Sequence, residues 1–155
     1  MILTIELTNI CNAKCKFCAY RYQKREKNTI SDELFKNAVC QFAGIGGGTL
    51  NLTPIVGDPL IDKNLISKIK YARKMKEIEH IFFFTNLIGL SNFDINDLLL
   101  SGIHKIHVSV CIGSREMYTR VYGVDKYDSV MQNLDSLLKE NRRLGDRVKI
   151  EAWRT

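Results

Sequence analysis

Segments with the pattern of a β-strand alternate with segments with the pattern of an α-helix along the whole chain. Strands are expected at 2–8, 49–53, 80–85, 105–111 and 147–153, and helices at 31–43, 62–77, 94–101 and 127–144. Strands joined through helices form right-handed βαβ units, and such units build a parallel sheet. The alternation therefore predicts an α/β protein with about five parallel strands.

The predicted strands carry polar residues on one side only. In the second strand, Thr49, Asn51 and Thr53 alternate with Leu50 and Leu52. A parallel sheet covered by helices on both faces would be apolar throughout, so this pattern predicts helices on one face and a polar concave face on the other. The expected fold is a partial (β/α) barrel that is open at its last strand. In such barrels the chemistry lies at the carboxyl ends of the strands.

The open last strand needs an explanation, because an exposed strand edge is a liability in a soluble protein. Three explanations stay open: the sequence is a fragment of a longer enzyme, a second copy covers the edge in a dimer, or the sheet remains open. No shift in composition divides the chain, so residues 1–155 are expected to form a single domain.

The composition excludes several classes of protein. The chain is 45% hydrophobic and 26% charged, as in ordinary globular proteins, and no apolar run is long enough to cross a bilayer. The N-terminus lacks the basic flank of a signal peptide. We therefore expect a cytoplasmic protein, in which clustered cysteines bind metals rather than form disulfides. Neither a membrane nor a nucleic-acid partner is expected, since no nucleic-acid-binding motif occurs.

Three cysteines occur within eight residues: Cys11, Cys15 and Cys18. Three thiolates on one short loop can bind a single soft metal centre, and the upstream Cys11 favours a metal over a Cys15–Cys18 redox pair. A [4Fe–4S] cluster usually takes four cysteine ligands. With three, one iron is left for a ligand that is not protein. A zinc site completed by Cys40 or a histidine is the alternative, although structural zinc sites usually draw two pairs of ligands.

The run from Cys11 to Cys18 resembles the CxxxCxxC signature of the radical S-adenosylmethionine (SAM) enzymes. The preceding residues 5–9 (IELTN) are similar to the strand before the cluster loop in the SPASM branch of peptide-modifying maturases, and Phe17 occupies the aromatic position before the third cysteine. The resemblance implies a radical SAM core in which Cys11, Cys15 and Cys18 hold a [4Fe–4S] cluster and SAM is the second cofactor.

Weaker motifs follow in the family's order. The segment Val56-Gly57-Asp58-Pro59 is similar to the Gly-Gly-Glu-Pro segment that binds the amino group of SAM, although Val56 replaces the first glycine and Asp58 replaces glutamate. Gly57 lets the backbone approach a ligand, Pro59 fixes the turn, and a carboxylate such as Asp58 accepts hydrogen bonds from an ammonium group.

The later motifs match in part. Thr85-Asn86 resembles a Thr-Asn-Gly segment in which Leu87 replaces the glycine. Ser109 and Arg120 resemble a serine strand end followed by an Arg-containing helix start, and the corresponding residues of related enzymes contact the carboxylate and ribose of SAM. The implied cofactor-binding residues are Phe17, Gly57, Asp58, Pro59, Thr85, Asn86, Ser109 and Arg120.

The resemblance implies an enzyme that cleaves SAM reductively to methionine and a deoxyadenosyl radical, which abstracts hydrogen from a substrate. The branch suggests a peptide substrate, and the reaction implies an electron-donor protein as a partner. The alternatives are a glycyl-radical-activating enzyme, which has similar size and cysteine spacing, and a truncated, non-catalytic module that binds a cluster or zinc. The remaining cysteines, Cys40 and Cys111, cannot supply the auxiliary clusters of many relatives.

The chain is basic, with a net charge of +6, and six lysines and arginines lie between residues 14 and 27. Two interpretations of this run stay open. Charge runs are usually solvated loops. A basic mouth that attracts an anionic partner is the functional interpretation.

Overall fold

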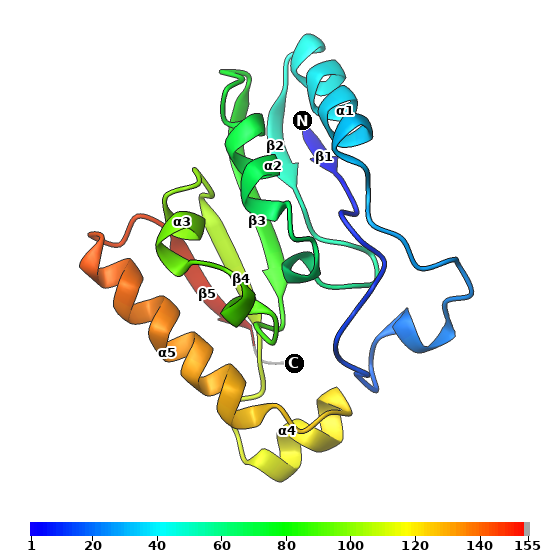
Figure 1. Cartoon of the computed structure of the whole chain (residues 1–155), viewed down its shortest axis with the longest axis vertical. Helices are drawn as coiled ribbons and strands as arrows, with labels where there is room; N and C mark the ends of the chain where they lie inside the picture. Colours follow the sequence, from blue (N-terminus) through cyan, green and yellow to red (C-terminus); the bar gives the residue numbers. More distant parts are fainter. Residues whose placement is uncertain (154–155) are drawn as a thin grey trace.

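The computed structural model describes residues 1–153, and its strands form one parallel sheet. The strand order follows the sequence, so every strand pairs in parallel with the next one along the chain (Figure 1). The strands are β1 (Ile2–Thr4), β2 (Gly48–Asn51), β3 (Ile78–Thr85), β4 (Lys105–Ser109) and β5 (Lys149–Trp153). The sheet is not closed, because β1 and β5 each have one neighbour among the described strands. The predicted partial barrel of five parallel strands is confirmed.

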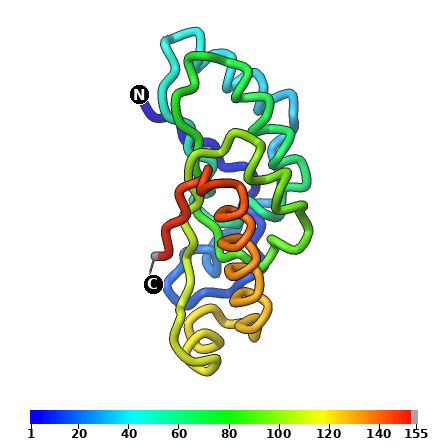
Figure 2. Tube along the Cα trace, turned by 90° about the vertical axis from the view of Figure 1, so that its left-hand side faces the viewer, coloured from blue at the N-terminus to red at the C-terminus, as the bar shows by residue number. Residues whose placement is uncertain are grey.

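Helices cover one face of the sheet (Figure 2). The α-helices are α1 (Asp32–Gly44), α2 (Leu65–Ala72), α3 (Ile95–Leu99), α4 (Arg115–Tyr122) and α5 (Tyr127–Arg143), and short 3₁₀ turns lie at η1 (Ala19–Tyr22), η2 (Pro59–Ile61) and η3 (Leu90–Asn92). Ser31 caps α1 as the sequence suggests, because its hydroxyl accepts a hydrogen bond from the Leu34 amide at 3.1 Å.

The elements differ from the sequence pattern in several places, and α4 was not among the expected helices. The first strand was expected to reach residue 8 but ends at Thr4, and Thr8 instead pairs antiparallel with Thr29. The helix expected at 62–77 is shorter, and Asp62, which precedes α2, pairs with Lys68 of that helix. Arg120 was expected near a helix start, yet it lies in the last turn of α4.

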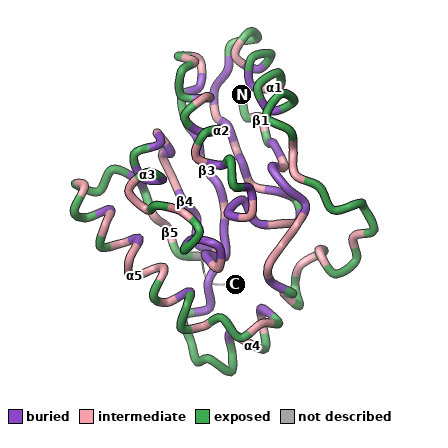
Figure 3. Tube along the Cα trace, in the orientation of Figure 1, coloured by how far each residue is buried: buried purple, intermediate pink, exposed green. Residues whose placement is uncertain are grey.

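The core lies between the sheet and its helices, where the buried parts of the trace concentrate along the central strands (Figure 3). Leu50, Ile81 and Phe83 are fully buried on this side, as is Val108. The intervening residues of the same strands face the other way. This alternation places polar and aromatic side chains on the concave face, as predicted for β2.

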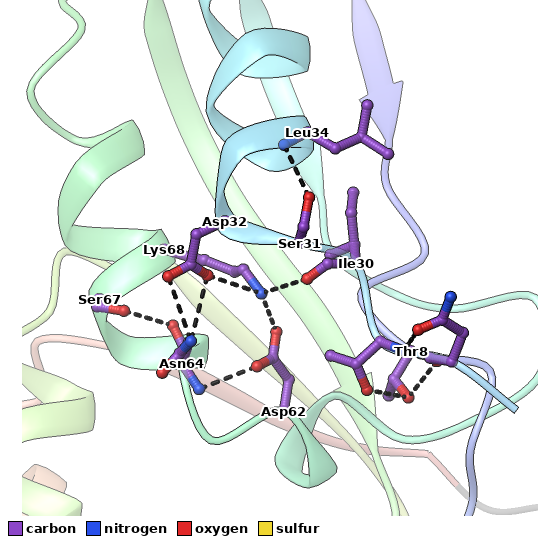
Figure 4. Close-up of polar contacts among 11 residues, drawn as sticks. Thr8, Ile30, Ser31, Asp32, Leu34, Asp62, Asn64, Ser67 and Lys68 are labelled. Carbon is purple, nitrogen blue, oxygen red and sulfur yellow. Dashed lines mark hydrogen bonds and ion pairs between the residues drawn. The ribbon is translucent and has the colours of Figure 1, made fainter.

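A network around the buried Lys68 joins the start of α1 to α2 (Figure 4). The Lys68 ammonium lies 2.6 Å from the Asp62 carboxylate, and both side chains are 3% exposed. Lys68 also donates to the Ile30 carbonyl at 3.1 Å and lies 3.3 Å from Asp32. Buried charges are tolerated only when they are paired and hydrogen-bonded, and here each has such partners. The network fixes where the chain leaves the cysteine loop and enters α1.

Candidate active site at the carboxyl ends of the strands

The cysteine loop lies between β1 and α1, at the carboxyl end of the sheet, and two other segments hold its backbone. The Ile10 carbonyl accepts a hydrogen bond from the Asp58 amide at 2.9 Å. On the other side, the amides of Lys14 and Lys16 donate to the carbonyls of Tyr122 and Val121, both at 2.9 Å. The loop therefore bridges the segment after β2 and the end of α4.

Two glycines permit this close approach. Gly57 has φ +128°, and a Cβ added there would lie 2.4 Å from the Thr8 carbonyl oxygen. Gly123 ends α4 in the left-handed conformation, with φ +68°, and a Cβ there would lie 2.6 Å from the Lys14 carbonyl oxygen. Both positions need glycine for conformation and for space. Gly57 was identified from its motif, whereas the role of Gly123 in holding the loop was not foreseen.

Asp58 connects the second and third motifs. Its side chain is 2% exposed, and its carboxylate accepts hydrogen bonds from the Asn86 amide at 2.8 Å, the Thr85 hydroxyl at 3.0 Å and the Leu60 amide at 3.0 Å. Burial raises the pKa of this carboxyl, while these donors lower it. The carboxylate thus turns into the protein, where it fixes the strand end at Thr85-Asn86.

Asn86 continues this network into the cysteine loop. Its side-chain amide donates to the Asn12 side-chain oxygen at 2.9 Å and lies 3.8 Å from the Cys11 sulfur. The following residue, Leu87, has φ +61° and is buried. The left-handed conformation explains why a glycine suits this place, and Leu87 adopts the conformation without being glycine. The three motifs therefore meet at one point beside Cys11.

Sequence reasoning missed two residues that shape this region. Glu6 accepts hydrogen bonds from the Ile55 amide at 2.9 Å and the Val56 amide at 3.4 Å, and it pairs with Arg25 at 2.7 Å. Its carboxylate thereby joins the segment before Gly57 to the basic run. A lone acid in a strand pattern gives no signal for such a contact.

Asn9 organises the other side of the loop. Its side chain donates to the Glu26 carbonyl at 2.7 Å and accepts from the Asn28 amide at 2.8 Å, and its own carbonyl accepts from Gln23 at 2.7 Å. These hydrogen bonds hold residues 9–28 together as one compact loop. An Asn directly after a strand signals a turn, but it does not reveal which residues it will bind.

The three cysteine thiols are half-buried, free and close enough to influence one another electrostatically. Burial raises the pKa of Cys11 to about 11, and nearby Asp58 and Cys18 add to this effect. Burial, followed by Cys11 and Cys18, raises the pKa of Cys15 to about 12. Thiolates that repel one another ionise readily only when a cationic centre offsets their charge. This donor set fits an iron–sulfur cluster.

The described residues include no group of three or more His, Cys, Asp or Glu side chains arranged to hold a metal ion. A single ion needs its ligands to converge on one point, as at zinc, where sulfur lies about 2.3 Å from the metal. A [4Fe–4S] cluster instead takes each cysteine on a different iron.

Tyr118 supplies a second observation that fits a group bound beside the cysteines. Its hydroxyl is buried and has no hydrogen-bond partner among the described residues. The ring stacks on Tyr122 with centroids 4.6 Å apart, and burial, together with Tyr122 and Cys15, raises the pKa of the phenol. An orphaned buried hydroxyl costs about 1–3 kcal/mol, so an acceptor beside Cys15 would relieve this cost.

The other predicted contacts lie further from this network. Phe17 is 59% exposed and packs edge-to-face on Tyr122, with centroids 6.0 Å apart. Ser109 ends β4 and is half-buried, and Arg120 is exposed on α4. Cys111 is a small buried thiol, as expected, and the exposed Cys40 lies 3.2 Å from the Tyr71 hydroxyl.

The concave face contains aromatic residues as well as polar ones. His107 stacks on Phe84 with centroids 4.1 Å apart, and its Nδ1 lies 3.2 Å from Glu151. Burial lowers the pKa of His107, although Glu151 opposes this effect. Further down the sheet, an open hollow of about 450 Å³ is lined by Thr49, His80, Ile81, Phe82, His104, Lys105 and Lys149.

Residues 5–149 match the family model of the radical SAM superfamily. The chain belongs to the radical SAM superfamily. Members of this superfamily bind a [4Fe–4S] cluster and SAM, and these are the cofactors of this chain. No helix among the described residues is long and apolar enough to span a membrane.

Several curated relatives are GTP 3',8-cyclases. The enzyme of Actinobacillus succinogenes is 26% identical over 154 residues, which cover 97% of this chain and 44% of that protein. A probable GTP 3',8-cyclase of Saccharolobus islandicus is 27% identical over 138 residues, covering 88% and 43%. The chain therefore spans less than half the length of these relatives.

Solved structures share the fold. BtrN in complex with AdoMet and 2-DOIA superposes with a TM-score of 0.70 at 20% identity, covering 97% of this chain and 56% of BtrN. Native anSMEcpe with bound AdoMet and a Cp18Cys peptide gives 0.73 at 18% identity, covering 97% and 42%. HydG, a maturase of the [FeFe]-hydrogenase, gives 0.73 at 15% identity, covering 99% and 34%.

Proposed function

We propose that this radical SAM core binds its cluster through Cys11, Cys15 and Cys18 and cleaves SAM reductively beside them. The observation that carries the proposal is the convergence of three motifs on the cysteine loop, through the hydrogen bonds from Asn86 to Asn12 and from Asp58 to Ile10. A cluster held by these three cysteines would, when bound and reduced, supply the electron for reductive cleavage of SAM.

The residues of the chain bind and orient the cofactors. Gly57 lets the segment after β2 pack closely against the backbone of Thr8 and Ile10, and Pro59 begins the 3₁₀ turn that follows; this segment would bind the SAM amino group. Asp58 supports the site from inside the protein, because its carboxylate oxygens already accept hydrogen bonds from Leu60, Thr85 and Asn86. We therefore assign Asp58 the positioning of Thr85 and Asn86 rather than direct contact with the ammonium group.

The remaining assignments follow from position. Ser109 lies at the carboxyl end of β4, where it faces the ligand side of a partial barrel. Arg120 is an exposed guanidinium suited to a carboxylate. Phe17 lies in the cysteine loop, against Tyr122. Together with the motif residues, these side chains would surround SAM, while the concave face would hold the substrate.

Cyclisation of GTP is a second candidate function, because the GTP 3',8-cyclase of A. succinogenes matches 97% of this chain. The expected peptide substrate stays a prediction that these relatives do not support. Deoxyadenosine release that rises on addition of GTP would favour the cyclase assignment. Release that rises with a peptide instead would favour the maturase branch.

The proposed function is tested by anaerobic reconstitution with iron and sulfide, followed by dithionite, SAM and an assay for deoxyadenosine. The wild type should bind about four irons and four sulfides per chain and release deoxyadenosine. Cys15→Ser should lose both the cluster and the release of deoxyadenosine. Cys40→Ser is the matched control, because Cys40 is exposed on α1, and it should keep both. A Cys15→Ser variant with full activity would refute the proposal.

A further inference from the structure

The basic run beside the cysteines forms a surface with a distinct charge. Residues 14–27 contain six lysines and arginines against one acid, Glu26, which gives a local charge of +5 in a chain whose net charge is +6. All six cations are exposed. Among the described residues, only Arg25 of these six forms an ion pair, with Glu6. We call this surface the basic loop surface: Lys14, Lys16, Arg21, Lys24, Arg25 and Lys27.

The basic loop surface also contains exposed aromatic rings. Phe17 is 59% exposed and Tyr22 is 71% exposed, and the Arg21 guanidinium lies 4.9 Å from the centre of the Tyr22 ring. A hollow of about 340 Å³ is lined by Lys14, Tyr20, Arg21, Gln23, Arg25 and Lys27. Aromatic residues and arginine are enriched at protein interfaces, and both occur together on this surface. The composition therefore suits a protein partner with an acidic surface.

The position of the basic loop surface indicates the role of a protein that binds to it. Lys14 and Lys16 lie between the cysteines, and the cysteines themselves are half-buried. A protein seated on the basic loop surface would thus lie within a few residues of the proposed cluster ligands. The proposed function consumes one electron per SAM cleaved, and that electron has to enter from outside the chain.

We propose that the basic loop surface is the docking site of an acidic electron-carrier protein, which passes one electron to the cluster and is itself oxidised by one electron. This inference rests on the proposed function. Complementary charge raises the rate of association about 10–10³-fold, and salt screens the effect beyond about 10 Å at 0.1 M.

The test compares two electron sources on the reconstituted full chain. One is an acidic flavodoxin reduced to its hydroquinone, and the other is reduced methyl viologen, a small cation. The test variant is Lys24→Glu with Lys27→Glu, which lowers the local charge from +5 to +1. The matched control is Lys74→Glu with Lys76→Glu, the same charge change on exposed residues after α2.

Stopped-flow reduction by flavodoxin at low salt should slow at least tenfold in the test variant and less than twofold in the control. Raising the salt to 0.5 M should bring the wild type down toward the test variant. Reduced methyl viologen should reduce the test variant and the control variant at least as fast as it reduces the wild type. Equal slowing in both variants, or no slowing in either, would overturn the docking site.

The two proposals fail in different ways. If viologen produces no deoxyadenosine from the wild type, the proposed function fails. If viologen supports cleavage while flavodoxin reduces every variant equally fast, only the docking site fails. Slower reduction by both electron sources in the test variant would show that the substitutions disturb the cluster, and this result would also count against docking.

Discussion

Replacing Gly123 by alanine should disturb the cysteine loop, and with it cluster binding, while the protein still folds. Gly123 and Gly145 both follow a helix with a positive φ, +68° and +79°. An alanine in this conformation costs about 1–2 kcal/mol. A Cβ at Gly145 meets nothing within 4 Å, whereas a Cβ at Gly123 lies 2.6 Å from the Lys14 carbonyl oxygen. Gly145→Ala is therefore a matched control for the conformational cost alone.

The extra cost at Gly123 comes from the loop. The Lys14 carbonyl has to move before an ordinary van der Waals distance is restored, and the movement strains the bond from the Lys14 amide to the Tyr122 carbonyl, 2.9 Å long. A hydrogen bond contributes about 1 kcal/mol. We expect Gly145→Ala to lower the free energy of unfolding by about 1 kcal/mol and Gly123→Ala to lower it by about 2–3 kcal/mol.

Urea unfolding of the cluster-free protein measures the first effect, and iron and sulfide content after anaerobic reconstitution measures the second. Gly123→Ala should bind less than half of the wild-type cluster, while Gly145→Ala should bind the same amount as the wild type. Equal stability and equal cluster content in the two variants would refute the argument that Gly123 holds the cysteine loop.

Three further predictions concern the supporting network. Asp58→Asn removes at least one buried acceptor, so it should cost about 2 kcal/mol in urea unfolding and weaken SAM binding in a calorimetric titration. Lys68→Met leaves the Asp62 carboxylate buried and unpaired, so thermal unfolding should show a loss of about 3–5 kcal/mol. The Nδ1 of His104 accepts a hydrogen bond from the Ile81 amide, and burial, with help from Arg73, lowers the pKa of His104. The unfolded state therefore binds more protons, so stability should fall as the pH drops below about 6.5, and His104→Gln should reduce this slope.

The sequence carried enough information for the sheet and for the main motifs. Alternating strands and helices predict a parallel sheet, because the periodicity of each element is local. The motifs at Gly57 and Thr85 were found through the family resemblance, and the parallel topology brings both strand ends to the same edge of the sheet.

Contacts made across loops could not be predicted in this way. Asp58 turns inward to Thr85 and Asn86, and Glu6 accepts amides about 50 residues along the chain. Such contacts depend on how the loops pack, which neither composition nor spacing encodes. Leu87 shows the same limit, because its positive φ follows from its place in the turn rather than from its own preference.

The most direct test of the central claim is the electron paramagnetic resonance spectrum of the reduced, reconstituted protein, recorded with and without SAM. The account predicts one [4Fe–4S] signal per chain whose shape changes when SAM is added, because one iron has no cysteine and is open to SAM. A signal that SAM leaves unchanged, or a protein that holds zinc in place of iron and sulfide, would contradict the account.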